Sequence, residues 1–110
     1  MILNFNQIEE AQIEGFKGGQ GLLFTRNYVD DNCKIMRSVL APGASTGLHE
    51  HMQNCEIILV LKGTLTFHCD GLTENCAEGD VHYCPKGHAH YMENLTDNPV
   101  EYFAVVAELR

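Results

Sequence analysis

Two histidines separated by a single residue are the clearest sign of chemistry in this sequence. His49 and His51 lie two positions apart, and in a β-strand such side chains point to the same face. Their imidazole nitrogens can therefore reach the same metal ion. A second pair with the same spacing, His88 and His90, follows later in the chain and can supply a further nitrogen.

Glu56 can add an oxygen to this set of nitrogen donors. It lies five residues after His51, an odd offset that would place it on the opposite face of a continuous strand. A chain reversal at Gln53 and Asn54 would let Glu56 begin the neighbouring antiparallel strand with its carboxylate turned back towards the imidazoles. Because Glu56 heads the apolar run 57–61, its carboxylate needs a hydrogen-bonding or cationic partner there.

Three imidazole nitrogens and one carboxylate oxygen suit one divalent transition metal ion, such as Fe, Mn, Zn, Ni or Co. In an octahedral sphere these donors leave two positions for water, substrate or dioxygen, and the ion can polarise a carbonyl or acidify a bound water. A structural zinc site fits less well, because such sites are usually closed, tetrahedral and rich in cysteine. The donor types therefore predict an open metal site that meets a small molecule.

The segments that must position these residues have the pattern of short β-strands. No segment keeps a 3.6-residue apolar period over the ten or more residues that a helix requires. Short apolar runs alternate with turns of Gly, Pro, Asn and Asp, which is typical of an all-β sandwich or barrel. A helical turn is expected only within 6–14. The expected strands cover residues 21–28, 34–40, 48–51, 55–61, 65–69, 81–84, 90–93 and 100–106.

Length and charge narrow the classes of function. The chain has 110 residues, with 15 acidic and 7 basic side chains and a formal net charge of −8. This length favours a single domain over 1–110, and the negative balance disfavours nucleic acid as a partner. The aliphatic run 57–61 is far shorter than the roughly 20 residues of a membrane helix, and the chain does not open on a secretory signal. We therefore expect a cytoplasmic protein that binds neither nucleic acid nor membranes.

The five cysteines are expected to be reduced thiols. They stand at positions 33, 55, 69, 76 and 84, an odd number without a C-x-x-C pair, which disfavours both a disulfide framework and a cysteine zinc site. Cys69 and Cys84 each lie in an apolar run and are expected to fill the core.

Two longer patterns resemble the motifs of the cupin superfamily. The first, G-x5-H-x-H-x4-E-x6-G, is matched at every defined position over 43–63, and the second, G-x5-P-x-G-x2-H-x3-N, over 79–94. The fifteen residues between them are typical of compact bacterial members, so the chain resembles a small stand-alone bacterial cupin of the cupin 2 conserved barrel type. The matching residues are Gly43, His49, His51, Glu56, Gly63, Gly79, Pro85, Gly87, His90 and Asn94.

The resemblance implies an all-β fold, a double-stranded β-helix or jelly-roll barrel, and a homodimer. It also implies the metal ligands, which by motif position are His49, His51, Glu56 and His90. His88 then lies outside the ligand set, with at most a role at the pocket mouth. His82 departs from small cupins, where this position is commonly aliphatic, and it joins His88 as a candidate catalytic residue.

Side-chain alternation predicts the lining of the pocket. Residues two and four positions after Glu56 share its face, and the residue two positions after His90 shares that of His90. Arg37 either anchors a substrate carboxylate or points outward. A pocket that is apolar apart from its metal favours a small organic ligand held by chelation. The expected lining comprises Ile58, Val60, Leu65, Phe67 and Met92.

Two functions from different classes fit these features. The favoured hypothesis is a metalloenzyme acting on a small oxygenated metabolite, of dioxygenase, decarboxylase, isomerase or lyase type. The alternative is a non-catalytic module that binds a sugar or a carboxylate, and it needs only the metal ligands and a cavity. Cupins host unrelated chemistries on one scaffold, so the fold does not decide between them. The enzyme requires a second catalytic group, for which the sequence offers His82, Tyr83, His88, Tyr91 and Tyr102.

Overall fold

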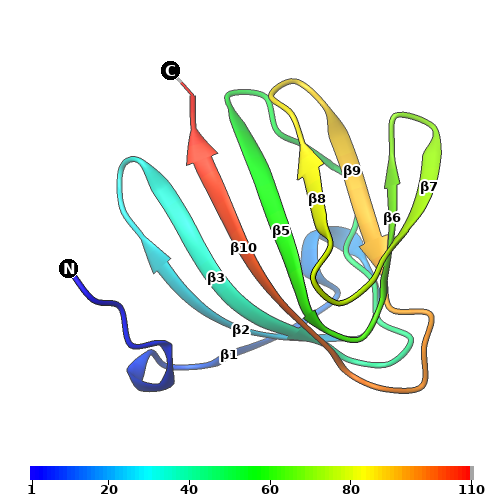
Figure 1. The fold of residues 1–110 in the computed structure, drawn as a ribbon, viewed down its shortest axis with the longest axis horizontal. Helices are drawn as coiled ribbons and strands as arrows, with labels where there is room; N and C mark the ends of the chain where they lie inside the picture. The colour runs from blue at the N-terminus through cyan, green and yellow to red at the C-terminus, as the bar shows by residue number, and fades with distance from the viewer. Residues whose placement is uncertain (110) are drawn as a thin grey trace.

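Ten β-strands and two short 3-10 turns make up the protein (Figure 1). A computed structural model describes residues 1–109, and within that range there is no α-helix and no helix able to cross a membrane. The turns are η1 (Phe5–Gln7) and η2 (Phe16–Gly18). The strands are β1 (Ala11–Glu14), β2 (Leu22–Val29), β3 (Cys33–Leu40), β4 (His49–Glu50), β5 (Asn54–Lys62), β6 (Leu65–Cys69), β7 (Leu72–Cys76), β8 (Val81–Cys84), β9 (Ala89–Glu93) and β10 (Val100–Glu108).

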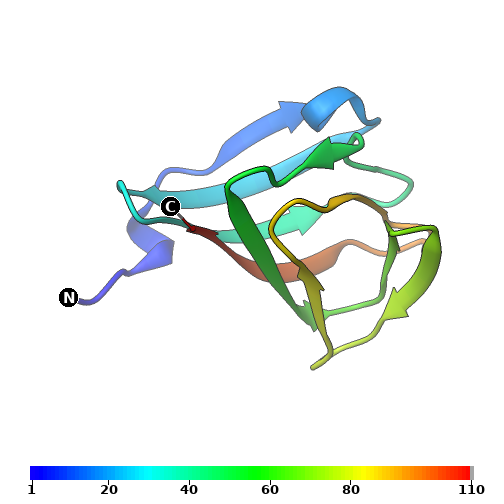
Figure 2. The ribbon, with the colours of Figure 1, turned by 90° about the horizontal axis from the view of Figure 1, so that it is seen from above.

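The strands form two antiparallel sheets that face each other. One sheet has six strands in the order β1-β2-β3-β10-β5-β8, and the other has four in the order β4-β9-β6-β7. Seen from above, the sheets enclose a space between them (Figure 2). The all-β barrel expected from the sequence is therefore confirmed.

Alternation along each strand decides which side chains fill this space. On β3 the buried residues are Met36, Ser38 and Leu40, while Arg37 between them is exposed. On β5 the same alternation buries Glu56, Ile58 and Val60. β5 and β9 both begin at the same end of the barrel (Figure 1), so residues early in these strands meet there. The apolar core comprises Leu23, Met36, Leu40, Ala44, Ile58, Val60, Leu65, Phe67, Cys76, Met92, Val100, Tyr102 and Ala104.

All eight expected strands are present, with bounds that differ by no more than two residues. The structure adds β1 and β7, which the sequence analysis missed. β7 has four exposed residues out of five, so it carries no apolar alternation, and its pairing with β6 follows from the tight turn at Asp70 and Gly71, with φ of 55° and 75°.

The helical turn expected within 6–14 is present only at the start of that range. Only a 3-10 turn over Phe5–Gln7 forms, and Ala11–Glu14 is an edge strand on β2. Three of the four residues of this strand are exposed, so its extended conformation depends on hydrogen bonding to β2 and on Ile13, which pairs with Leu23.

The cysteines are all free thiols within the described residues. Cys84 is fully buried, as expected for a core residue, whereas Cys69 is only partly buried near the end of β6.

Candidate metal centre

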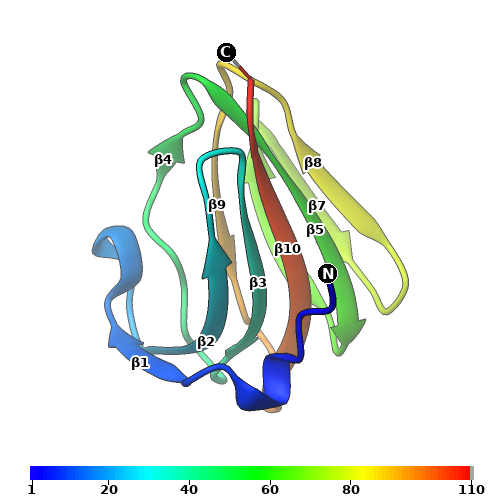
Figure 3. The ribbon, with the colours of Figure 1, turned by 90° about the vertical axis from the view of Figure 1, so that its left-hand side faces the viewer.

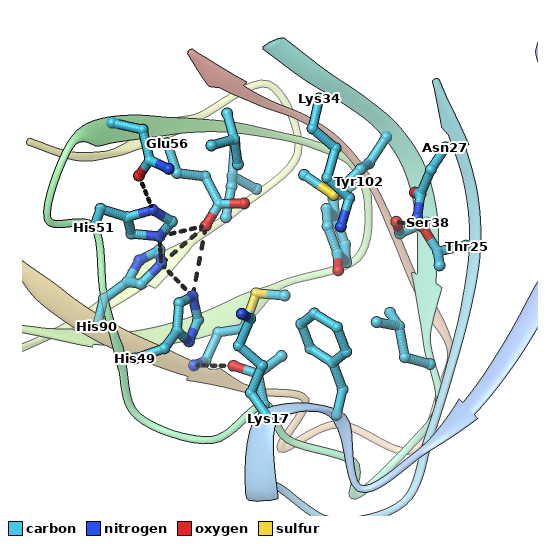
Figure 4. A pocket seen from close by; sticks show the side chains of 18 of the residues that line it. Lys17, Thr25, Asn27, Lys34, Ser38, His49, His51, Glu56, His90 and Tyr102 are labelled. Carbon is cyan, nitrogen blue, oxygen red and sulfur yellow. Dashed lines mark hydrogen bonds and ion pairs between the residues drawn. The ribbon is translucent and has the colours of Figure 1, made fainter. Parts of the chain in front are cut away.

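Three segments of the two sheets bring the predicted ligands together. His49 on β4 pairs directly with His90 on β9, and Glu56 lies near the start of β5 in the facing sheet. His51 follows β4, where its backbone N–H donates to the His88 carbonyl at 2.9 Å. The chain then reverses into β5 at Asn54, so the turn proposed from the sequence does direct Glu56 back to the imidazoles (Figure 4).

The donor atoms of this cluster have the spacing of ligands around one ion. The four side chains His49, His51, Glu56 and His90 offer atoms that all lie within 4.8 Å of one another. His90 Nε2 is 3.0 Å from His51 Nε2 and 3.1 Å from His49 Nε2. Glu56 Oε1 is 2.9 Å from His90 Nε2 and 3.3 Å from His51 Nε2, but 4.0 Å from His49 Nε2.

These separations fit an octahedral donor set. With bonds of about 2.1 Å, neighbouring donors on an octahedron are about 3.0 Å apart and opposite donors about 4.2 Å, whereas tetrahedral donors are about 3.4 Å apart. The 4.0 Å between His49 and Glu56 is close to the spacing of opposite donors, and the 3.0 Å between His51 and His90 is that of neighbouring donors. An octahedral ion held by these four residues would have its two remaining positions side by side, as a bidentate chelator requires.

Each imidazole is turned by a hydrogen bond at its other nitrogen. His49 Nδ1 is 2.8 Å from the Gly47 carbonyl, which can only accept, so the proton is on Nδ1 and Nε2 is free to bind a metal. His51 Nδ1 is held in the same way by Asn54 Oδ1 at 2.7 Å. These contacts fix the tautomer and the ring direction, as the supporting residues of a metal site do.

The Glu56 carboxylate is charged despite its burial. Burial raises the pKa of this carboxyl, but the adjacent imidazoles of His49, His51 and His90 outweigh burial and hold the pKa well below its usual range. The hydrogen bond to Glu56 in turn raises the pKa of His51. The cluster thus supplies one anion and three imidazoles at a buried position, a donor set suited to a divalent cation.

His82 supports the site without facing the cavity. Its Nε2 lies 3.0 Å from His90 Nδ1, and its ring stacks on Phe67 with centroids 3.9 Å apart. Burial lowers the pKa of His82 to about 4, so the ring is neutral and its Nε2 can accept the His90 Nδ1 proton. His82 is therefore placed as a positioning residue for the ligand His90.

The side chain of His88 lies outside the ligand cluster. Its imidazole pairs with Asp70 at 2.7 Å, and its side chain is 42% exposed. Only its backbone carbonyl meets the site, through the His51 N–H. The structure gives the His88 side chain no contact with the ligand cluster.

We expect the substitution His82→Phe to weaken metal binding about 10- to 100-fold. Phenylalanine keeps a flat ring for stacking on Phe67 but removes the acceptor of the His90 Nδ1 proton, so His90 is no longer held in the tautomer that presents Nε2. The affinity is measured by titrating metal-free protein with Mn(II) in competition with a chelator. The control is His88→Ala, which should bind Mn(II) as the wild type does, and equal affinities of all three proteins would contradict this role.

A cavity of about 300 Å³ opens beside the ligand cluster. Ile58 and Met92 line it, as expected from the sequence. Val60, Leu65 and Phe67 share the inward face but lie deeper, in the closed part of the core, with exposures of 0 to 1%. Alternation predicts the face of a strand correctly but does not show how far along the strand a cavity extends.

Polar side chains that the sequence analysis did not place also line this cavity. Lys17 and Lys34 reach into it, and Tyr102 and the hydroxyl pair Thr25 and Ser38 line it too (Figure 4). Burial raises the pKa of Tyr102, so its phenol keeps its proton. Lys34 was detectable from sequence, since it shares the alternation of the buried residues on β3. Lys17 was not detectable from the sequence, because it lies in an irregular turn.

Two other candidates point away from the cavity. Arg37 is on the outer face of β3, where its guanidinium hydrogen-bonds Glu101. Tyr83 is on the outer face of β8 and is 55% exposed. The cationic role considered for Arg37 is therefore open to the two lysines instead.

Known proteins resemble this chain in sequence and in structure. Residues 36–106 match the Cupin_2 family, described as a cupin domain. An oxalate-binding protein of Thermotoga maritima is 30% identical over 96% of this chain and 93% of its own length. A crystal structure from the same organism, of a predicted oxalate decarboxylase, superimposes with a TM-score of 0.92 at 29% identity and covers 99% of this chain and 100% of its own.

A more distant structure shows the fold alone. It is a sugar phosphate isomerase of the cupin superfamily from Silicibacter pomeroyi, with a TM-score of 0.80 and 22% identity over 98% of this chain and 76% of its own. The family match extends over most of the chain and contains all four residues of the ligand cluster. The chain belongs to the cupin family.

Proposed function

We propose that this protein binds one divalent transition metal ion and, through it, a small chelating carboxylate of the oxalate class. The observation that carries the proposal is the donor spacing, with His49 Nε2 4.0 Å from Glu56 Oε1 and His51 Nε2 3.0 Å from His90 Nε2. Four residues spaced in this way would leave an octahedral ion two neighbouring positions. Oxalate presents two oxygens in a five-membered chelate and fits such a pair of positions. The Thermotoga maritima relative named as oxalate-binding supports the same ligand class.

The residues of this chain have separate tasks in that function. His49, His51, Glu56 and His90 would hold the ion, which when bound supplies a Lewis acid for the carboxylate oxygens. Met92, Ile58 and the buried edge of Tyr102 exclude water around the ligand, which strengthens electrostatic attraction inside the cavity. The ammonium of Lys17, which reaches into the cavity near His49, balances the negative charge that a chelating carboxylate brings.

A carbon–carbon lyase is the second candidate, and the cavity position of Lys17 favours it. Cleavage of a chelated acid to carbon dioxide leaves an electron pair on the remaining carbon, and that carbon must receive a proton. The Lys17 ammonium reaches into the cavity near His49 and can hold such a proton (Figure 4). A lyase is an enzyme, which is the class of function that the sequence analysis favours. A non-catalytic binding module would need no proton donor.

The test is a calorimetric titration of Mn(II)-loaded protein with oxalate, followed by carbon-13 NMR of labelled oxalate left with the same protein. We expect stoichiometric binding that disappears when the metal is removed. Formation of labelled formate and carbon dioxide would identify the lyase, and unchanged oxalate would identify the binding module. Binding of equal strength with and without metal, or no binding at all, would contradict the proposed function.

A further inference from the structure

Two lysines face the cavity without an acidic partner. Lys17 and Lys34 both line it, and within residues 1–109 neither ammonium forms an ion pair. Lys34 is partly buried on the inward face of β3, in line with Met36 and Ser38. A cation so placed is stabilised by an anion that enters the cavity, because a partly desolvated ammonium lacks part of its hydration.

Lys34 stands across the cavity mouth from the ligand cluster. It pairs with Val106 on β10, and Val106 pairs on its other side with Glu56 on β5. Lys34 and Glu56 therefore occupy one row of the six-stranded sheet, two strand spacings or about 10 Å apart at their backbones. Side chains from both ends of the row project into the same space, so a ligand of a few carbon atoms can span them.

Lys17 is held over the same space by an unusual backbone. It lies in η2 with φ of 53° and ψ of 30°, a left-handed conformation that costs a side-chain-bearing residue about 1–2 kcal/mol. Glycines on either side, Gly15 and Gly18, also have positive φ, and a third glycine at this position would relieve the strain. Its side chain reaches into the cavity on the side of His49 (Figure 4).

The acids around the cavity mouth do not pair with these lysines. Asp30 accepts hydrogen bonds from the backbone N–H groups of Asn32 and Cys33, and Glu108 accepts one from Asn54 at 3.4 Å. Asp30, Glu50 and Glu108 are exposed to solvent, where their repulsion of an anion is screened. Lys34 is less exposed, so its attraction for an anion in the cavity is screened less.

We propose that the cavity takes a chelating acid with a second carboxylate, which Lys34 binds while Lys17 faces the chelating end. This inference rests on the proposed function and extends it, because oxalate engages only the metal end. The volume of the cavity agrees with a ligand larger than oxalate. About 300 Å³ holds roughly ten waters at about 30 Å³ each, whereas oxalate has six non-hydrogen atoms. A 2-oxo diacid of five carbons has the required groups at both ends.

The experiment compares two acids that differ only at the far end. Mn(II)-loaded protein is titrated calorimetrically with 2-oxoglutarate and with 2-oxopentanoate, which has the same chelating end and chain length but no second carboxylate. We expect 2-oxoglutarate to bind about tenfold tighter or more, as for a charge-assisted hydrogen bond. The variant Lys34→Met should lose this difference and keep the wild-type affinity for 2-oxopentanoate and for Mn(II).

Two further variants separate the roles of the lysines. Lys17→Met should weaken both acids by a similar factor of about three, because it removes an exposed charge near the end that the acids share. Lys62→Met, an exposed lysine at the far end of β5, should change neither affinity.

A titration with oxalate distinguishes the diacid site from the proposed function. Equal binding of the two five-carbon acids by the wild type, or a difference that persists in Lys34→Met, would overturn the diacid site while oxalate binding leaves the proposed function intact. Failure of the five-carbon acids to bind when oxalate binds would also overturn it. Failure of all three acids to bind would overturn both proposals.

Discussion

Replacing His90 with alanine should reduce metal affinity by more than about 100-fold, beyond the loss that follows when only a supporting residue is removed. His90 Nε2 lies close to all three other ligand atoms, at 2.9 Å from Glu56 Oε1, 3.0 Å from His51 Nε2 and 3.1 Å from His49 Nε2. Its removal therefore takes away the central donor of the set. Metal content after dialysis against a weak chelator measures the effect.

The matched control for this variant is His68→Ala. His68 lies on the same sheet and also contacts a carboxylate, Glu93, at 2.7 Å, but it stacks on Tyr91 and does not belong to the cluster. It should retain stoichiometric metal. Because His90 is 2% exposed, its truncation also leaves a cavity, so Glu56→Gln serves as a variant of nearly unchanged shape that should lose metal as well. Stoichiometric metal in His90→Ala would show that the ligand assignment is wrong.

Sequence reasoning predicted this cluster of side chains because their spacing is local. Two residues along a strand return to the same face, so His49 and His51 had to converge wherever the strand lay. The turn at Gln53 and Asn54 then determined the face of Glu56. The choice of His90 over His88 needed the second motif, and the structure shows the physical difference between them: His90 faces inward in direct pairing with His49, whereas His88 precedes β9 and pairs with Asp70.

The extent of the cavity could not be predicted in the same way. Val60 and Phe67 do face inward, but the depth at which the core closes depends on how the two sheets pack, which no single strand specifies. His82 illustrates a related limit. Its alternation indicates burial, yet its task depends on Phe67 and His90, which come from other strands.

Irregular turns were the least predictable part of the site. Lys17 reaches the cavity because η2 packs on the segment before β4, a contact between residues about thirty positions apart that hydrophobic patterning does not reveal. Figure 3 shows this turn beside the chain that leads into β4. Gly47 lies at the point of contact, which makes it a sensitive position for the whole site.

Alanine at Gly47 should destabilise the protein by about 3 kcal/mol, the upper part of the range for an overfilled site. A Cβ atom there would lie 1.7 Å from the Lys17 carbonyl oxygen and 2.5 Å from its carbon, and both are backbone atoms that cannot rotate away. The turn must move, which breaks the hydrogen bond from Gly47 N–H to the Phe16 carbonyl at 3.0 Å. Urea unfolding of the metal-free protein measures the free energy change.

The substitution Gly47→Ala should also weaken metal binding. A substitution that only lowered the free energy of unfolding would leave the metal affinity of the folded protein unchanged. The Gly47 carbonyl accepts the His49 Nδ1 proton, so a shift of this peptide turns His49 away from the other donors. Gly43→Ala is the control: it has φ of 74° but open space around its Cβ, so it should cost only about 1–2 kcal/mol and leave metal affinity unchanged. If Gly47→Ala matched Gly43→Ala in both measurements, the contact between η2 and the segment before β4 would not be what orients His49.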